Sequence, residues 1–191
     1  MVVTSTQTYT AAEYLELEEN ASVRHEYRNG EIVEMPGGTV NHNKLTLSLI
    51  FLLMQNLQGD LYEILGTDVR LWVGDRNFYT YPDVMVVPKP IALQDNRQDT
   101  VTNPVFIAEV LSELTRNYDL SEKFAAYRTI PTFREYLLID QSKLYVEQHL
   151  KQTSNQWLMT EYKDPEQSIF LESLGIELSL NGLYKNIKFD I

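Results

Sequence analysis

The chain has 191 residues, of which 43% are hydrophobic, and it contains no cysteine. This length suits one domain with a sizeable core, and the missing cysteines exclude disulfides, thiolate zinc sites and thiol nucleophiles. The formal net charge of −11 at pH 7 repels polyphosphate at long range and is evidence against nucleic-acid binding.

The sequence shows no membrane or targeting segment. No apolar run reaches the roughly 18 residues that a membrane span requires. Residues 1–6 lack the basic start and the apolar stretch of a signal peptide. There is also no repeat, linker or low-complexity tract. We therefore expect a cytoplasmic protein in which residues 1–191 form one domain.

The N-terminal part of the chain predicts a helix followed by a hairpin. Thr10 and Glu13 have the spacing of a capping box, which predicts a short helix that ends before Glu18. The Asn29-Gly30 pair stands between two short strand patterns. Such a pair favours the two positive φ angles of a type I′ turn, so we expect a tight β-hairpin there.

The next elements are a long helix and a series of strands. Leucines recur at helical spacing over residues 40–57, which predicts a helix with one buried face. Strands are expected at residues 62–65, 68–73, 84–87, 105–111 and 134–139, with a mostly β tail over residues 144–191. A turn is expected at residues 74–77, an irregular loop at 91–103 and a helix at 118–128.

Residues 105–111 are nearly continuously apolar, which is typical of a strand buried on both faces. Strand and helix patterns alternate through the middle of the chain. We therefore expect an α/β fold in which a mixed β-sheet has helices on both sides, preceded by the N-terminal helix and hairpin.

Glu109 is a carboxylate inside this apolar strand. An ionised carboxylate buried without a partner costs several kcal/mol, so a cation or an Arg or Lys side chain must compensate it. A second acid, Asp83, leads into the strand expected at residues 84–87. Two acids at neighbouring strand ends suit Mg²⁺, which takes one or two carboxylates together with waters and phosphate oxygens.

Pro82-Asp83, followed by a glutamate in a hydrophobic strand, resembles the core of the PD-(D/E)XK nuclease superfamily. The order of landmarks resembles, more specifically, the Uma-type group of endonucleases that is abundant in cyanobacteria. The similarity runs over most of the chain and implies a restriction endonuclease-like fold. The matching segments are residues 26–31, His42, residues 82–84, residues 109–112, Asp119 with Lys123 and Tyr127, and residues 135–140.

The chain departs from the superfamily pattern at one position. The pattern has a lysine two residues after the glutamate, where this chain has Leu111. In the Uma-type group the basic residue comes from the following helix, and Lys123 matches that position. Asp119 and Lys123 are four residues apart and share one helical face, so Lys123 is expected to reach toward Glu109.

The resemblance implies a role for each matching residue. Asp83 and Glu109 would hold Mg²⁺ or Mn²⁺, with the carbonyl of Val110 as a third ligand. Lys123 would position or polarise the attacking water and offset charge in the transition state. Glu26 would be an additional acid that binds metal-coordinated water or a second cation.

Each of these residues also has a purely structural interpretation. Glu109 could form a buried ion pair, and Asp83 could be a turn residue at the strand start. Lys123 could belong to an exposed helix pair, and Glu26 could be a cross-strand partner of a basic neighbour. His42, a candidate phosphate contact, could be only a polar helix start.

The leading hypothesis is therefore a magnesium-dependent endonuclease that hydrolyses DNA and pairs as a homodimer, as nucleases of this fold do to cut two strands. The alternative is a catalytically inactive module of the same fold that binds a protein or nucleic-acid partner. The acid surplus and Leu111 favour that alternative. A third hypothesis, hydrolysis of a small phosphodiester, suits the acidic composition better than DNA does.

Overall fold

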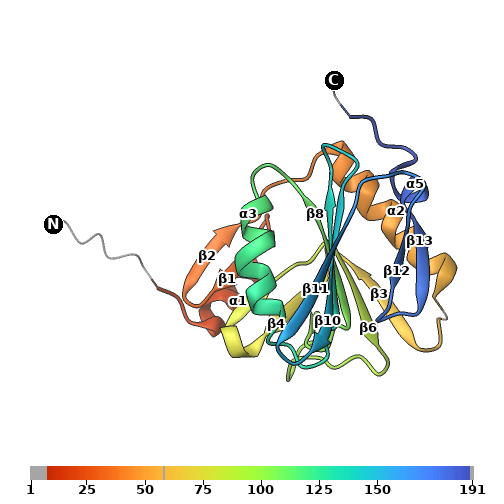
Figure 1. Cartoon of the computed structure of the whole chain (residues 1–191). Coiled ribbons are helices and arrows are strands. Elements are labelled where there is room, and N and C mark those ends of the chain that lie inside the picture. Colours follow the sequence, from red (N-terminus) through yellow and green to blue (C-terminus); the bar gives the residue numbers. More distant parts are fainter. Residues whose placement is uncertain (1–7, 58, 190–191) are drawn as a thin grey trace.

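The computed structural model describes residues 8–189 except residue 58. Its largest element is a six-stranded sheet in the order β11-β10-β9-β8-β6-β3 (Figure 1). β8 and β9 are parallel and the other neighbours are antiparallel, so the sheet is mixed. The strands are β3 (Tyr62–Gly66), β6 (Val84–Pro88), β8 (Phe106–Leu111), β9 (Glu135–Asp140), β10 (Val146–Thr153) and β11 (Gln156–Tyr162).

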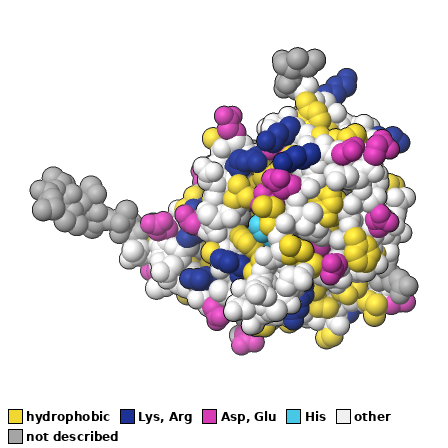
Figure 2. Space-filling model, in the orientation of Figure 1, with side chains coloured by type: hydrophobic (Ala, Val, Ile, Leu, Met, Phe, Trp, Pro, Cys, Tyr) yellow, Lys and Arg dark blue, Asp and Glu magenta, His cyan; other side chains and the backbone are white. Residues whose placement is uncertain are grey.

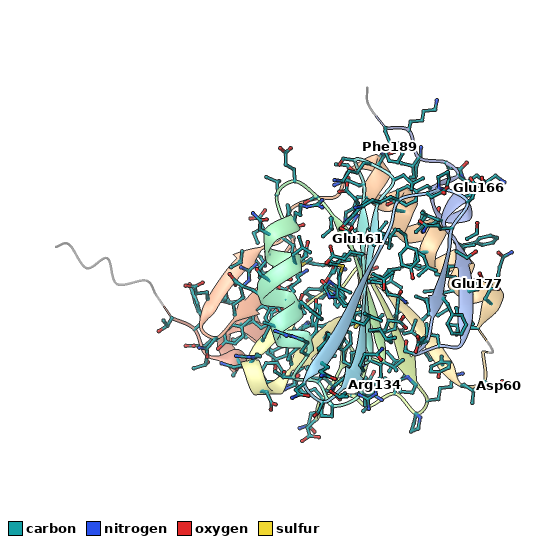
Figure 3. All side chains as sticks on the ribbon, in the orientation of Figure 1. Asp60, Arg134, Glu161, Glu166, Glu177 and Phe189 are labelled. Atoms are coloured by element: carbon teal, nitrogen blue, oxygen red, sulfur yellow. The ribbon has the colours of Figure 1, made fainter. Side chains whose placement is uncertain are left out.

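Helices cover both faces of this sheet, and side chains fill the space between the layers (Figures 1 and 3). One face packs against α2 (Val40–Asn56), α5 (Leu180–Tyr184) and the hairpin of β12 (Ser168–Leu171) and β13 (Ile176–Ser179). The other face packs against a helical segment made of α3 (Arg116–Tyr118), a π turn (Asp119–Lys123) and α4 (Phe124–Tyr127). Among the described residues, no helix has the length and apolarity to cross a membrane.

The alternation of side chains along β6 and β8 decides which layer each residue meets. Val84 and Ala108 pack in the cluster with α2, whereas Met85 and Ile107 pack in the cluster with α4. Residues at odd positions of these two strands therefore face the helical segment, and Glu109 is one of them. Fully burying an aliphatic side chain in either cluster contributes about 1.5–3 kcal/mol to stability.

A second sheet, in the order β2-β1-β5-β4-β7, lies beside the helical segment. Its strands are β1 (His25–Arg28), β2 (Glu31–Glu34), β4 (Arg70–Val73), β5 (Phe78–Thr80) and β7 (Thr100–Val101). Helix α1 (Ala11–Glu19) packs on it through Tyr14, which stacks between Tyr27 and Tyr79 at centroid distances of 5.4 and 5.2 Å.

The predicted mixed sheet with helices on both sides is confirmed, as are the N-terminal helix and the hairpin. Thr10 and Glu13 form the capping box. Asn29 and Gly30 have φ angles of 46° and 112°, the positive pair that the turn requires. The long helix expected at residues 40–57 is also confirmed, because α2 spans Val40–Asn56.

Several boundaries were predicted wrongly. Helix α1 continues through Glu19 instead of ending before Glu18. Strand β5 was not predicted, and β7 lies inside the expected loop at residues 91–103, because strands of three and two residues are too short to show alternation. The helix expected at residue 118 begins at Arg116. Residues 1–6, where we expected no signal peptide, lie outside the described residues.

Candidate active site

Asp83 and Glu109 lie side by side at the edge where β6 begins and β8 ends. Strand β6 runs antiparallel to β8 with Val84 opposite Ala108, so the next residue pair outward is Asp83 and Glu109. The backbone N–H of Asp83 donates to Glu109 Oε2 at 3.3 Å, and the N–H of Val110 donates to Asp83 Oδ2 at 2.7 Å. Each carboxylate is thus held by the backbone of the other strand.

Lys123 is the centre of the cluster. Its Nζ lies 3.1 Å from Glu109 Oε1, 3.3 Å from Glu26 Oε1 and 3.2 Å from Asp119 Oδ1. Lys123 and Asp119 are both buried, so the interpretation of an exposed helix pair is wrong. The π turn carries both residues and directs them toward the sheet. The structure therefore brings together Glu26, Asp83, Glu109, Asp119 and Lys123.

Glu26 is fixed on all sides. Its Oε1 accepts from Thr80 Oγ1 at 2.5 Å, and its Oε2 accepts from Tyr118 at 2.8 Å and from Arg28 at 3.0 Å. Burial opposes ionisation of Glu26, but Lys123 and these hydrogen bonds outweigh it and lower its pKa. Glu26 is not the cross-strand partner of a basic residue, because Arg28, with which it pairs, lies on the same strand.

His42 joins the cluster from the opposite layer. Thr39 caps the start of α2, and the His42 Nε2 atom lies 3.1 Å from Asp83 Oδ2. Burial disfavours the imidazolium, but the hydrogen bond and charge of Asp83 outweigh it and raise the pKa of His42. The side chain is thus more than a polar helix start.

The sequence placed Tyr127 among the residues that match the family but gave it no role, and it did not identify Tyr118. Tyr127 is fully buried and donates to Glu109 Oε1 at 2.8 Å. It follows Lys123 by four residues, so the helical spacing was the available signal. The role of Tyr118 depends on the packing of α3 against β1, which the sequence does not show.

The cluster holds more acid than base. Burial, reinforced by Asp83 and Asp119 and opposed by Lys123, raises the pKa of Glu109 to about 8. Burial also raises the pKa of Asp119 against the opposing charge of Lys123. Burial disfavours the ammonium, yet Glu109 and Glu26 outweigh it and raise the pKa of Lys123. Glu109 and Asp119 therefore hold a proton more tightly than free carboxyl groups do.

The residues present fit a divalent ion held by two carboxylates. Asp119 Oδ1 is buried and, among the described residues, accepts no hydrogen bond, although Lys123 Nζ lies near it. No three His, Asp or Glu side chains of the described part of the chain are arranged to hold a metal alone. Mg²⁺ needs only one or two carboxylates, since water and substrate phosphate supply its other oxygens.

The sequence matches the model of the Uma2 family, described as "Putative restriction endonuclease", over residues 11–181. The chain belongs to the Uma2 family. Two proteins of Synechocystis sp. (strain ATCC 27184 / PCC 6803 / Kazusa) are similar to it. The uncharacterized protein sll1609 is 47% identical over 84% of this chain and 91% of its own length. The uncharacterized protein slr1290 is 31% identical over 93% of this chain and 92% of its own length.

A solved structure shares the fold of this Uma2 chain. The crystal structure of "a putative nuclease belonging to DUF820" from Anabaena variabilis ATCC 29413 superposes with a TM-score of 0.75, covering 93% of this chain and 98% of that chain. At 17% sequence identity the likeness concerns the fold. The predicted resemblance to the Uma-type group is confirmed.

In this Uma2 chain the superfamily lysine position is part of the core. Leu111 is buried in the cluster between the sheet and α4. Lys123 reaches Glu109 from the helical segment instead, as the departure from the superfamily pattern led us to expect.

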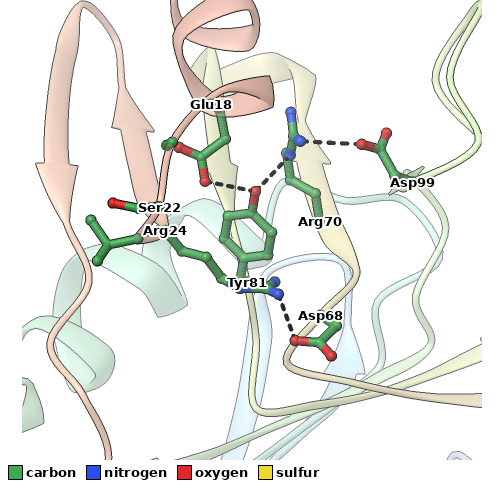
Figure 4. A pocket seen from close by; sticks show the side chains of 9 residues that line it. Glu18, Ser22, Arg24, Asp68, Arg70, Tyr81 and Asp99 are labelled. Atoms are coloured by element: carbon green, nitrogen blue, oxygen red, sulfur yellow. Dashed lines mark hydrogen bonds and ion pairs between the residues drawn. The ribbon is translucent and has the colours of Figure 1, made fainter.

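A cavity of the Uma2 chain lies away from these residues. It has a volume of about 410 Å³, and its lining includes Glu18, Arg24, Arg70, Tyr81 and Asp99 (Figure 4). Its charges are paired, since Arg70 binds Asp99 at 3.2 Å and Tyr81 bridges Arg70 and Glu18 at 3.0 Å each. The charge surplus is instead at the Asp83 and Glu109 cluster, which we take as the candidate site.

Proposed function

We propose that this chain is a magnesium-dependent endonuclease that hydrolyses DNA phosphodiester bonds at the Asp83 and Glu109 edge. One observation carries the proposal. Three carboxylates, those of Glu26, Glu109 and Asp119, surround the ammonium group of Lys123. The carboxylate of Asp83 lies at the neighbouring strand end, where the backbone N–H of Asp83 donates to Glu109. Such a surplus of negative charge in a buried position calls for a cation.

Asp83, Glu109 and the carbonyl of Val110 would hold Mg²⁺ or Mn²⁺. The bound ion would supply a Lewis acid for a phosphoryl oxygen and lower the pKa of a bound water. Membership of a family described as "Putative restriction endonuclease" supports the nuclease activity of the proposal.

Lys123 would keep its proton and place a positive charge beside the two ligand carboxylates. This charge would stabilise the negative charge that develops on the phosphoryl oxygens. Glu26 is almost fully buried and contacts Lys123 at 3.3 Å, so we assign it the positioning of that ammonium. His42, with its raised pKa, would present a cation to a phosphate next to Asp83.

Because the overall charge is negative, we expect DNA to approach over a local group of cations. Lys and Arg side chains gather on the face drawn in Figure 2. Arg116, Lys143 and Lys163 lie within 6.0 Å of the ring centre of Tyr145. Arg116 begins the helical segment that carries Lys123. Acids also border this group, so we expect DNA binding to be weak and to depend on the divalent ion.

A catalytically inactive module that binds a protein or nucleic-acid partner is the second candidate. Leu111 in the core favours it, as does the enclosure of Lys123 by three carboxylates. The two candidate functions differ in one measurable property, since the endonuclease hydrolyses DNA and the inactive module does not.

Plasmid cleavage tests the proposal. Wild-type protein with Mg²⁺ or Mn²⁺ should convert supercoiled DNA to nicked or linear forms. Asp83→Asn and Glu109→Gln should each lower the rate at least about 100-fold, the scale of losing one main transition-state interaction. Glu63→Gln, which alters an exposed ion pair with Lys89, is the matched control and should cleave normally. Folded wild type without metal-dependent cleavage would support the inactive module.

A further inference from the structure

The outward face of α2 carries an unusual set of side chains for an exposed helix. Seven of its residues are exposed, and none of them is charged. Four are apolar, namely Val40, Leu47, Phe51 and Met54, with exposed fractions of 71, 58, 59 and 68%. A surface helix ordinarily presents charged or polar residues to water, and contiguous exposed apolar patches mark interaction sites.

These four residues, which we call the α2 apolar face, form one stripe. Leu47, Phe51 and Met54 follow the spacing of successive helical turns, and Val40 lies two turns before Leu47. Leu61, just before β3, is also exposed. The inner face of the same helix, with Leu45, Leu49 and Leu53, is completely buried, so the helix is apolar on both sides.

Charge decides what fits this face. The chain carries 27 acidic and 16 basic residues, yet α2 contains no Asp or Glu. Two copies that met through acidic surfaces would repel each other, whereas the α2 apolar faces themselves contain no acid. Nucleic acid requires exposed cations, and a membrane-surface helix carries Lys or Arg beside its apolar residues. The exposed residues of α2 include no Lys or Arg, so neither nucleic acid nor a membrane surface fits this face.

We propose that two copies of this chain pair through their α2 apolar faces, related by a two-fold axis. Such an axis brings the same patch of both copies together and is the commonest symmetry of soluble oligomers. A helix of 17 residues offers a strip about 25 Å long and about 10 Å wide. This strip is smaller than the roughly 800 Å² per partner of a standard interface, so the dimer dissociates on dilution.

The pairing also concerns the candidate site, because the first turn of α2 carries His42, whose Nε2 atom lies 3.1 Å from Asp83 Oδ2. A dimer therefore holds two candidate sites in one particle. The pairing itself does not depend on the proposed activity, and its test uses no DNA or metal.

Sedimentation velocity over the micromolar range tests the inference. Wild type should shift from monomer to dimer as concentration rises, and Phe51→Glu should stay monomeric with an unchanged melting temperature. Phe170→Glu is the matched control, since Phe170 is 53% exposed on β12, and it should pair as wild type does. A mixture of Phe51→Glu and Phe51→Lys should recover the dimer by charge pairing across the axis.

Three results would overturn it. Wild type that stays monomeric through high micromolar concentrations excludes the dimer. A dimer that survives Phe51→Glu and its mixture unchanged lies on another face. Wild type that is monomeric but sediments with phosphatidylcholine vesicles, and loses this binding in Phe51→Glu, uses the α2 apolar face on a lipid surface instead.

Discussion

Glu109 shows how a single buried acid determines the behaviour of the whole cluster. It accepts from Lys123 and Tyr127 through one oxygen and from the backbone of Asp83 through the other. Burial nevertheless raises the pKa of Glu109 to about 8, and the negative charges of Asp83 and Asp119 beside it act in the same direction. Proton and metal ion should therefore compete for this carboxylate, since a ligand must be deprotonated to bind a metal.

The raised pKa of Glu109 has a consequence for stability. Between its ordinary value of 4.5 and about 8, Glu109 holds a proton in the folded protein and loses it on unfolding. The folded state thus binds more protons, and stability without metal should fall as pH rises from 5 toward 8. The raised pKa values of Asp119 and His42 act in the same direction.

Melting temperatures measured from pH 5 to pH 8 in a chelator test this prediction. The amide of Glu109→Gln does not titrate, so the melting temperature of this variant should change less between pH 5 and pH 8. Each kcal/mol of pH-dependent stability that is lost should reduce that change by about 2–4 °C. Glu161→Gln, an exposed acid on β11, serves as the control and should keep the wild-type slope. Equal slopes in wild type and Glu109→Gln would show that this carboxyl is ionised at pH 7.

At the scale of elements, the site depends on strand register and on one irregular turn of helix. The sequence predicted the neighbouring strand ends that carry Asp83 and Glu109, because long apolar strands have clear patterns. It did not predict the π turn that directs Asp119 and Lys123 inward, since a single π turn inside a helix is rare and has no characteristic sequence pattern. The partners of Glu26 come from β5 and α3, whose places follow from tertiary packing.

Strand β1 depends on its hairpin turn to place Glu26. Gly30 has a φ of 112°, which L residues rarely adopt, and an added Cβ would meet Thr8 at an ordinary 3.6 Å. Gly30→Ala should thus lower stability through backbone strain alone, by about 1–3 kcal/mol. Asn29→Gly, at a φ of 46°, relieves a positive φ and should be nearly neutral. Denaturant unfolding measures both, and equal stability of the two variants would refute the strained turn.

At the scale of the whole molecule, a net charge of −11 must be reconciled with a polyanionic substrate. The group around Tyr145 brings three cations together, although Arg116 is paired with Asp140 and Lys163 with Glu161. We therefore expect DNA to contact few phosphates and to bind with a shallow salt dependence, because each neutralised phosphate contributes to that dependence.

Binding titrations at several salt concentrations test the approach of DNA. Ca²⁺ takes oxygen ligands as Mg²⁺ does and can occupy the site during binding. Replacing both Lys143 and Lys163 by Ala should weaken binding and reduce the slope of log affinity against log salt by about 1–2. Lys89→Ala, just after the end of β6 that is far from Asp83, is the control. An unchanged slope in the double variant would place the DNA on another surface.

The proposed activity depends on Asp83 and Glu109 sharing one divalent ion. A crystal structure of the protein soaked in millimolar Mn²⁺ tests this most directly through the anomalous signal of the metal. We predict one ion bound by both carboxylates, with Glu109 turned from Lys123 to the metal, and no ion in Glu109→Gln. A soaked crystal in which Glu109 keeps its bonds to Lys123 and Tyr127, with no ion beside it, would contradict the account.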